Sequence, residues 1–289
     1  MMTLPSPLPN PPSQAGERTD RDAIFAANRG VGRIELAVKA QGGVTRLARV
    51  HEAGSLRVRC PNTTSAEMEA VILNTAGGVA GGDKLDVGIA AGEGARLVVT
   101  TAAAEKIYRT SGSEATIGVK LDVAAGAALA WLPQETILFS RARLSRSIDV
   151  SLAPDARLML AEAIVFGRSG MGETVEEGAL FDRWRVRRGG KLIYAETVRV
   201  DGAIAGRLAE PAVARGGIAV ATLLIVPGDD VTVAAIRALD HRFVGEVGAS
   251  AWNGIAAARL CAVDGAALRH DLTHVMTALR GSLPRIWTN

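Results

Sequence analysis

The feature that most constrains the fold of this chain is a short turn followed by a strand, which recurs about every 30 residues. Three copies begin with small or acidic residues and reach a leucine three positions later, and a fourth is looser at its turn: Gly94–Leu97, Gly126–Leu129, Asp155–Leu158 and Gly190–Glu196. A unit of this length cannot bury its apolar face alone, so the copies must stack. The repeat therefore predicts a mainly β fold of stacked sheets, as in a β-solenoid or a β-sandwich.

After Pro211 the pattern changes from short strands to an alternation of strands and helices. Apolar runs predict strands at 218–226 and 252–263, and helical spacing predicts helices at 231–239 and 266–280. We therefore expect solenoid-like stacked sheets with a small C-terminal α/β portion. In domain terms this is a single domain at 21–289, β-rich over 21–210 and α/β over 211–289.

Several features bear on the compartment of the protein. Residues 1–20 contain five prolines and no cationic segment followed by an apolar one, so they resemble a disordered tail and not a signal peptide. Cys60 and Cys261 are far apart and neither belongs to a C-x-x-C pair, which favours reduced thiols. No apolar run is long enough to span a membrane. These observations predict a cytoplasmic protein.

The charge pattern argues against nucleic acid as a partner. The formal net charge is only +3 and aromatic residues make up 4% of the chain. Arg183, Arg185 and Arg187 alternate along a predicted strand with no aromatic platform beside them. A solvated strand face or a protein interface fits this arrangement better than a nucleic-acid groove.

Carboxylates occur at repeat positions that should face the interior. Side chains at alternate positions of a strand share a face, so the fourth residue after each leucine shares the face of that leucine. These residues are Thr101, Pro133, Glu162 and Glu196, and Glu135 has the same parity, although Pro133 must interrupt the strand there. The pattern predicts that Glu135, Glu162 and Glu196 point inward.

Buried carboxylates are costly unless they are paired or hydrated, so three interpretations stay open. The glutamates could pair with arginines such as Arg168 or Arg199. They could instead line a water-filled channel or bind a divalent ion through oxygen ligands. A pair of acids is also typical of glycoside hydrolases, although few aromatic residues are present to stack on sugar rings.

A glycine-rich segment at Asn74–Asp83 is the most distinctive local motif. Its four glycines allow sharp turns or the close approach of another chain, and they are followed by an aspartate: Gly77, Gly78, Gly81, Gly82 and Asp83. The spacing matches neither a dinucleotide fingerprint nor a P-loop, and Asp83 would repel a phosphate. The segment is thus either a tight turn between strands or a contact surface.

Two histidines, His270 and His274, stand at positions i and i+4 of the last predicted helix. One metal ion could bridge them, and with Asp271 the string is similar to a zincin motif with Asp in place of Glu. A third ligand is not evident, and histidines at this spacing are more often ordinary surface residues. No nucleophile-elbow motif or other catalytic constellation is evident.

Five ordered motifs resemble the UreD (UreH) family of urease accessory proteins. They are Asn74–Asp83, Thr100–Arg109, Trp131–Phe139, Gly167–Glu173 and Leu279–Trp287. The chain departs from the family at Ala102, where glutamine is common, and in its Pro-rich tail. The resemblance implies a non-catalytic β-helical scaffold that binds the urease apoprotein and joins UreF and the GTPase UreG, so that nickel reaches the urease active site.

The resemblance also suggests roles for the residues singled out above. We hypothesise that Thr100, Thr101, Glu135, Glu162 and Glu196 line a polar route through the protein. Oxygen ligands would hold nickel only transiently, so no tightly bound cofactor is expected. The glycine-rich segment would face a partner or shape the entrance of the route. A stand-alone metal-binding protein and a β-solenoid carbohydrate hydrolase remain the alternatives.

Overall fold

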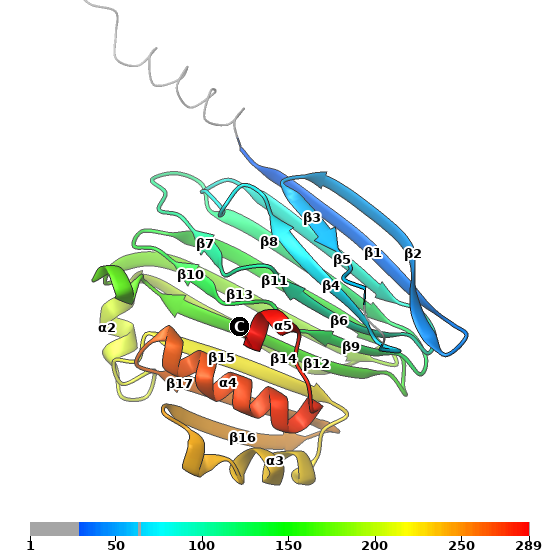
Figure 1. Cartoon of the computed structure of the whole chain (residues 1–289). Coiled ribbons are helices and arrows are strands. Elements are labelled where there is room, and N and C mark those ends of the chain that lie inside the picture. The colour runs from blue at the N-terminus through cyan, green and yellow to red at the C-terminus, as the bar shows by residue number, and fades with distance from the viewer. Residues whose placement is uncertain (1–28, 63–64, 289) are drawn as a thin grey trace, which may run out of the picture.

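Two β-sheets lie face to face, and helices pack on the outer side of one of them (Figure 1). The computed structural model describes residues 29–62 and 65–288. The predicted tail at residues 1–20 lies outside the described residues. We call the two sheets A and B.

Sheet A has seven strands within the described part of the chain. Their spatial order is β14 (Lys191–Ala203), β13 (Glu177–Arg188), β11 (Arg143–Leu152), β8 (Ala115–Val123), β5 (Lys84–Ala91), β1 (Val31–Gln41) and β2 (Val44–Gly54). The five strands between the two edges run parallel, whereas β14 and β2 are antiparallel to their neighbours.

Sheet B has ten described strands. Its main order is β16 (Glu246–Trp252), β17 (Ile255–Ala262), β15 (Ala219–Val226), β12 (Arg157–Phe166), β9 (Ala128–Trp131), β6 (Arg96–Thr101), β4 (Met68–Asn74) and β3 (Leu56–Arg59). The short strands β10 (Thr136–Leu138) and β7 (Glu105–Ile107) continue the sheet beside the far end of β12. The four strands from β12 to β4 run parallel.

The chain winds between the sheets as stacked coils, which confirms the predicted solenoid-like fold. It passes from β5 in sheet A to β6 in sheet B, returns to β8, and repeats this path through β9, β11, β12 and β13. The repeated turns lie at one end of the coils. Ala95, Ala127 and Ala156 are fully buried in these turns, and hydrogen bonds such as that from the Ala128 amide to the Ala95 carbonyl, 2.8 Å long, join successive turns.

The fourth copy of the repeat does not form another coil. Gly189 and Gly190, both with positive φ, turn the chain sharply after β13, and β14 then returns antiparallel beside β13 in sheet A. The sequence resembles the other copies because it keeps a turn and a strand, but the turn is a hairpin. The expectation of a fourth stacked unit was therefore wrong.

The helices lie mainly toward the C-terminus. They are η1 (Ser169–Met171), α2 (Ile204–Ala209), α3 (Asp230–Arg237), η2 (Asp240–Arg242), α4 (Gly265–Arg280) and α5 (Arg285–Thr288). The predicted strand at 252–263 is the second half of a hairpin, β16–β17, whose turn is at Asn253 and Gly254. The predicted helix at 231–239 begins at Asp230, with Asp229 as its N-cap.

Two hydrophobic cores result from this layering. The larger lies between the sheets and contains residues from the inner faces of both. The smaller lies between the outer face of sheet B and α3, α4 and α5, where Leu268, Leu272 and Val275 of α4 are buried. Sheet B is therefore covered on both faces, so a polar residue on any of its central strands is enclosed whichever way it points.

Candidate functional site

The interior between the sheets contains a buried ion cluster of one arginine and two carboxylates. Arg146 lies on β11, Asp182 on the neighbouring β13, and Glu162 on β12 of the opposite sheet. The Arg146 guanidinium binds Asp182 in a bidentate geometry, with an Nε–Oδ1 distance of 3.0 Å and an Nη2–Oδ2 distance of 2.6 Å, and its Nη1 donates to Glu162. The cluster therefore joins the two sheets across the core.

Strand alternation directs these polar side chains inward. Arg146 lies two positions from both Leu144 and Ile148, which are fully buried between the sheets, and Asp182 lies two positions before the buried Trp184. Residues at alternate positions share a face, so each charged group occupies a place where the strand would otherwise present an apolar side chain.

Two tryptophans complete the hydrogen bonding of the carboxylates. The indole Nε1 of Trp131 donates to Glu162 at 2.8 Å, and that of Trp184 donates to Asp182 at 3.2 Å. Each buried carboxylate thus receives hydrogen bonds from an arginine and from an indole, which offsets much of the cost of removing it from water.

The cluster has one cationic group and two carboxyl groups. Burial lowers the pKa of Arg146, but attraction to Asp182 and Glu162 outweighs burial and raises it, so the guanidinium stays charged. Burial and the nearby Asp182 carboxylate raise the pKa of Glu162, and Arg146 and the Trp131 indole oppose this only in part. When both carboxyl groups are ionised, one cation faces two carboxylates, and the excess negative charge attracts a proton or a metal cation.

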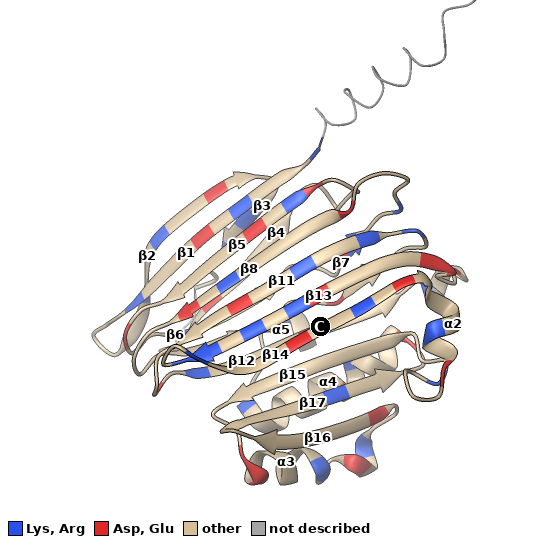
Figure 2. Ribbon diagram, turned by 180° about the vertical axis from the view of Figure 1, so that it is seen from behind, with Lys and Arg blue, Asp and Glu red and all other residues tan. Residues whose placement is uncertain are grey.

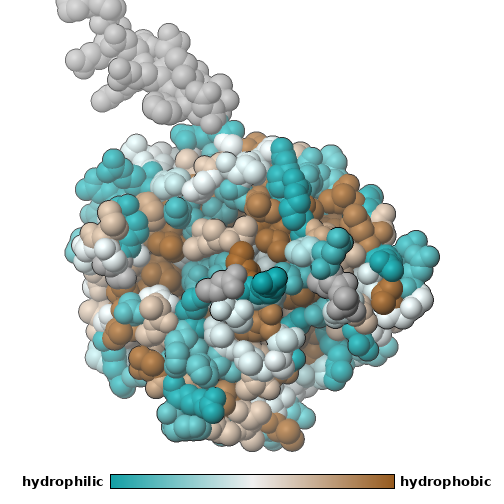
Figure 3. Space-filling view, in the orientation of Figure 1, coloured by the Kyte–Doolittle hydropathy of each residue, from teal (hydrophilic) through white to brown (hydrophobic). Residues whose placement is uncertain are grey.

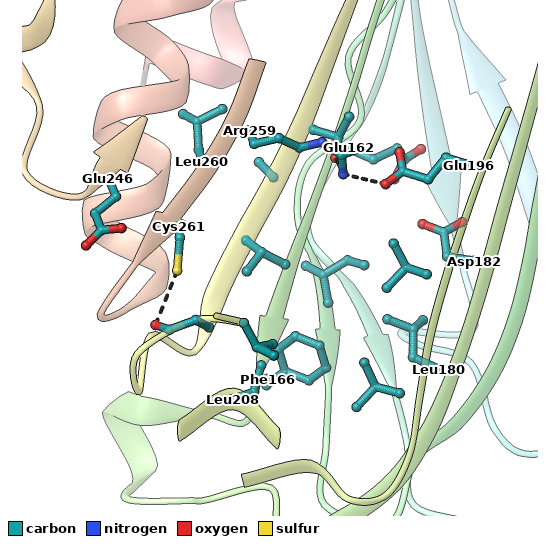
Figure 4. A pocket seen from close by; sticks show the side chains of 18 of the residues that line it. Glu162, Phe166, Leu180, Asp182, Glu196, Leu208, Glu246, Arg259, Leu260 and Cys261 are labelled. Atoms are coloured by element: carbon teal, nitrogen blue, oxygen red, sulfur yellow. Dashed lines mark hydrogen bonds and ion pairs between the residues drawn. The ribbon is translucent and has the colours of Figure 1, made fainter. Parts of the chain in front are cut away.

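The cluster opens onto a cavity of about 650 Å³ between sheet A and the C-terminal strands of sheet B. Its charged lining residues are the carboxylates Glu162, Asp182, Glu196 and Glu246 and the arginines Arg146 and Arg259. Figure 4 shows the first three carboxylates gathered at one end of the cavity, whereas Phe166, Leu180 and Leu208 line the other end. The cavity is therefore acidic at one end and apolar at the other.

A second hydrogen-bonded group surrounds Glu196 at the same end of the cavity. The carboxylate pairs with Arg259 of β17 and accepts a hydrogen bond from the Tyr194 hydroxyl. Arg259 also donates to the Tyr194 oxygen at 3.2 Å and to Thr222 at 3.1 Å. Burial and the hydrogen bond to Glu196 raise the pKa of Tyr194, which therefore remains a donor. Glu162 and Glu196 thus lie at one cavity, as separate ion pairs.

A row of polar residues crosses sheet B from the glycine-rich segment toward the ion cluster. The Asn74 amide donates to both carboxylate oxygens of Glu105, at 3.1 and 3.2 Å. Glu105 is the direct neighbour of Thr136 in the β7–β10 pairing, and Arg146 donates to the Thr136 hydroxyl at 3.4 Å. Burial raises the pKa of Glu105 to about 7, against the lowering effect of Asn74. The row therefore contains a carboxyl group that titrates near neutrality.

The glycine-rich segment forms an exposed tip and a buried base. Residues 75–77 are exposed, whereas Val79 is buried and bridges to Ile107 of β7. The Asp83 carboxylate accepts hydrogen bonds of 2.7 Å from the amides of Gly30 and Ala80. Asp83 therefore fixes the shape of the segment.

The side chains that closely approach these glycines belong to this chain itself. A Cβ on Gly78 would lie 2.4 Å from Cε2 of Tyr108, and a Cβ on Gly81 would lie 2.2 Å from Oγ1 of Thr110. The Tyr108 hydroxyl also donates to the Gly77 carbonyl at 2.9 Å. The tip at residues 75–77 is thus the most exposed part of the segment.

The structure places Glu135 on the other face of sheet B, so the prediction that it points inward was wrong. β9 ends at Trp131 and β10 begins at Thr136, and Pro133 lies in the break between them. The alternation that holds within a strand does not carry across this break. Glu135 instead pairs with Arg269 of α4 at 2.9 Å.

Thr100 and Thr101 also point to opposite faces of sheet B. Thr100 alternates with Val98, which packs in the core beneath α4, and its hydroxyl has no hydrogen-bond partner among the described residues. Thr101 has the opposite parity, and its hydroxyl accepts a hydrogen bond of 2.9 Å from the Gln134 amide. Of the five residues proposed for a polar route, Glu162 and Glu196 share the cavity, whereas Thr100 and Glu135 lie on the α4 side.

The comparisons with known proteins agree with this architecture. The family model for the UreD urease accessory protein matches residues 30–288. A urease accessory protein UreD of Rhodopseudomonas palustris strain BisB18 is 56% identical over 270 residues, which cover 93% of this chain and 98% of the relative. The chain belongs to the UreD family. Its counterpart in Bradyrhizobium diazoefficiens is 53% identical over 267 residues, covering 92% of this chain and 97% of the relative.

The UreD-family protein is accordingly a urease accessory protein, and two of its motifs meet in the structure. The break inside Trp131–Phe139 leaves the Leu132 carbonyl free of the sheet, and the Trp287 indole donates to it at 3.0 Å. Arg269 donates to Gln134 at 2.6 Å and packs its guanidinium over the Trp287 ring at 4.6 Å. Trp287 of the C-terminal motif thus hydrogen-bonds to the break between β9 and β10.

The candidate metal ligands His270 and His274 lie together on α4, with ring centroids 4.3 Å apart. Among residues 29–62 and 65–288, no group of three or more His, Cys, Asp or Glu side chains is placed to hold a metal ion. The same part of the chain contains no helix that is long and apolar enough to cross a membrane.

The sequence reasoning missed the partners of the inward glutamates. The sequence suggested Arg168 and Arg199 as partners, but these arginines pair with Glu173 and Asp201. Alternation could have found the actual partner of Glu162, because Arg146 interrupts an apolar pattern at 144–150. Arg259, the partner of Glu196, comes from a distant hairpin, and no local signal identifies it.

Proposed function

We propose that this UreD-family protein is a non-catalytic scaffold that binds apo-urease together with UreF and the GTPase UreG, so that nickel reaches the urease active site. The family assignment supports a role in urease maturation, since the relatives are named urease accessory proteins. Neither Glu162 nor Glu196 is a free carboxylate, because each is held in an ion pair, which favours a scaffold over a hydrolase.

The observation that carries the nickel proposal is the acidic end of the internal cavity. At this end the carboxylates Glu162, Asp182 and Glu196 share the two arginines Arg146 and Arg259, so a divalent cation entering it would relieve an excess of negative charge. Carboxylate oxygens bind nickel more weakly than imidazole or thiolate ligands do. Such a lining suits a cation that passes through and is released.

In this proposal Glu162 and Glu196 hold the ion in turn, and Arg146 and Arg259 compensate the carboxylates when the ion is absent. The polar row through Thr136 and Glu105 extends the path toward the glycine-rich segment. Protonation of Glu105, whose pKa burial raises to about 7, would control the charge at that end of the path.

The route is tested by replacing single carboxylates with the isosteric amide. Glu162→Gln and Glu196→Gln should lower both the nickel content and the activity of urease matured in cells with a complete set of accessory proteins. Glu246→Gln is the matched control, because Glu246 lines the same cavity but is exposed and pairs with Arg215. Urease that is fully loaded by both test variants would refute the route.

The exposed tip of the glycine-rich segment is proposed to contact a partner protein. Ala76→Arg places a large charged side chain on this tip without entering the core, since Ala76 is exposed. We expect the variant to fold but to lose co-purification with UreF or with apo-urease. Gly81→Val is unsuitable for this test because its side chain would clash with Thr110. Unchanged recovery of both partners would rule out the tip as an interface.

The maturation role itself is tested in cells that carry urease and its accessory genes with the UreD-type gene deleted. Supplying this chain with its own matched partners and nickel should restore urea hydrolysis. No restoration by a soluble, expressed chain would contradict the proposed function.

A further inference from the structure

The histidine pair on α4 takes no part in the proposed internal route. Helix α4 crosses the outer side of sheet B, in front of the sheet in Figure 1, whereas the acidic cavity lies between the sheets. His270 is 44% exposed, and its ring lies 4.3 Å from that of His274 one turn later. The surface around α4 mixes hydrophilic and hydrophobic residues (Figure 3). The pair is therefore open to ions from solvent.

The hydrogen bonds fix the tautomer of both rings. His274 Nδ1 lies 2.9 Å from the His270 carbonyl oxygen, and a carbonyl can only accept, so this nitrogen carries the proton. His270 Nδ1 lies 3.0 Å from the Asp271 carboxylate, which already accepts two backbone amides and is best satisfied by a third donor. In both neutral rings the lone pair is consequently on Nε2.

The acceptor for His270 is itself rigidly held. Asp271 is 1% exposed, and its two oxygens accept hydrogen bonds from the amides of Val244 and Gly245 at 2.9 and 2.7 Å. A carboxylate that receives the Nδ1 proton of a histidine and a carbonyl that receives another are the two arrangements that commonly orient metal-binding imidazoles. Both occur here, on residues one helical turn apart.

We propose that His270 and His274 form a surface site for a first-row divalent cation, bound through both Nε2 atoms. Imidazole nitrogen suits nickel, copper and zinc, whereas magnesium and calcium prefer oxygen. Histidines at positions i and i+4 lie on the same side of a helix and can chelate one ion. With two protein ligands, water or a partner protein completes the coordination. The site goes beyond the proposed function and stands even if the internal route does not exist.

The test uses the full chain without a histidine tag, titrated with nickel sulfate in a calorimeter. The double variant His270→Asn/His274→Asn should lose one bound nickel ion per chain, and each single variant should weaken that site by at least about tenfold. His51→Asn and His241→Asn are matched controls, because they remove the other two of the four histidines. Circular dichroism checks that every variant is folded.

A second measurement reads the ligands directly. Electron paramagnetic resonance of the chain with one equivalent of Cu²⁺ should show coupling to two nitrogens in the wild type and not in the double variant. Equal nickel binding by wild type and double variant, or an equal loss in the His241→Asn control, would overturn the proposal. A copper spectrum with oxygen ligands alone would do the same.

Discussion

Ionisation of Glu105 should destabilise the folded protein between pH 4.5 and 7. Burial raises the pKa of this carboxyl from the ordinary 4.5 to about 7, and the hydrogen bonds from Asn74 only partly compensate. Below pH 4.5 the group is protonated in both the folded and the unfolded chain. Above pH 7 it is ionised in both, and the folded chain then bears the full cost of a buried carboxylate.

The size of the effect follows from the displacement of the pKa. At about 1.4 kcal/mol for each tenfold change in proton affinity, the shift corresponds to a loss of about 3 kcal/mol over the whole range. Between pH 5 and pH 8 the free energy of unfolding should fall by about 2.5 kcal/mol on account of Glu105 alone. The amide of Glu105→Gln cannot ionise and can still accept from Asn74, so the variant escapes this loss.

The assay is urea unfolding of the wild type and of Glu105→Gln at pH 5 and pH 8. The difference in free energy of unfolding between the variant and the wild type should grow by about 2.5 kcal/mol, in favour of the variant, from pH 5 to pH 8. All other titrating groups are the same in both proteins, so their contributions cancel in this difference. Glu177→Gln is the control, because its carboxylate is on the surface, with its side chain 69% exposed. A difference between wild type and Glu105→Gln that does not change with pH would refute the reasoning.

Three further substitutions probe other parts of the fold. Arg146→Met leaves Glu162 and Asp182 without their cation and should lower the free energy of unfolding by about 3–5 kcal/mol, measured in urea. Gly78→Ala places a Cβ 2.4 Å from the Tyr108 ring and should lower the melting temperature, whereas a variant as stable as wild type would show that the ring moves freely. Asp264→Ala removes the N-cap of α4, where the carboxylate accepts from the Ala267 amide at 2.8 Å, and should cost about 1 kcal/mol in thermal unfolding.

The sequence predicted the parts of the fold that depend on local patterns. The repeated turns form where coils stack, with their alanines Ala95, Ala127 and Ala156 buried, and Glu162 faces the interior as strand alternation requires. The prediction failed where tertiary geometry overrides the pattern. Gly189 and Gly190 direct the fourth copy into a hairpin, and the break at Pro133 moves Glu135 to the opposite face of its sheet.

For a related reason, only part of the candidate site could be predicted from the sequence. Acidic residues could be assigned to a face from their own strand, but their partners come from strands that are neighbours only in the folded molecule. Arg146 and Asp182 are 36 residues apart, and their contact depends on the β11–β13 pairing. Register between distant strands is set by the whole stack, which a single strand does not encode.

The polar row crosses neighbouring strands of sheet B, so its length depends on the number of coils. In Figure 2 the strands of sheet A run side by side as successive turns of the chain, and the same turns place β7 and β10 side by side in sheet B. Deleting the coil at residues 96–127 would remove Glu105 and bring Asn74 beside Thr136, about 4.8 Å closer to the ion cluster. The antiparallel strands β2 and β14 close sheet A at its two edges, so a coil can be gained or lost only from within the stack. The internal path can therefore lengthen or shorten only in whole strand spacings.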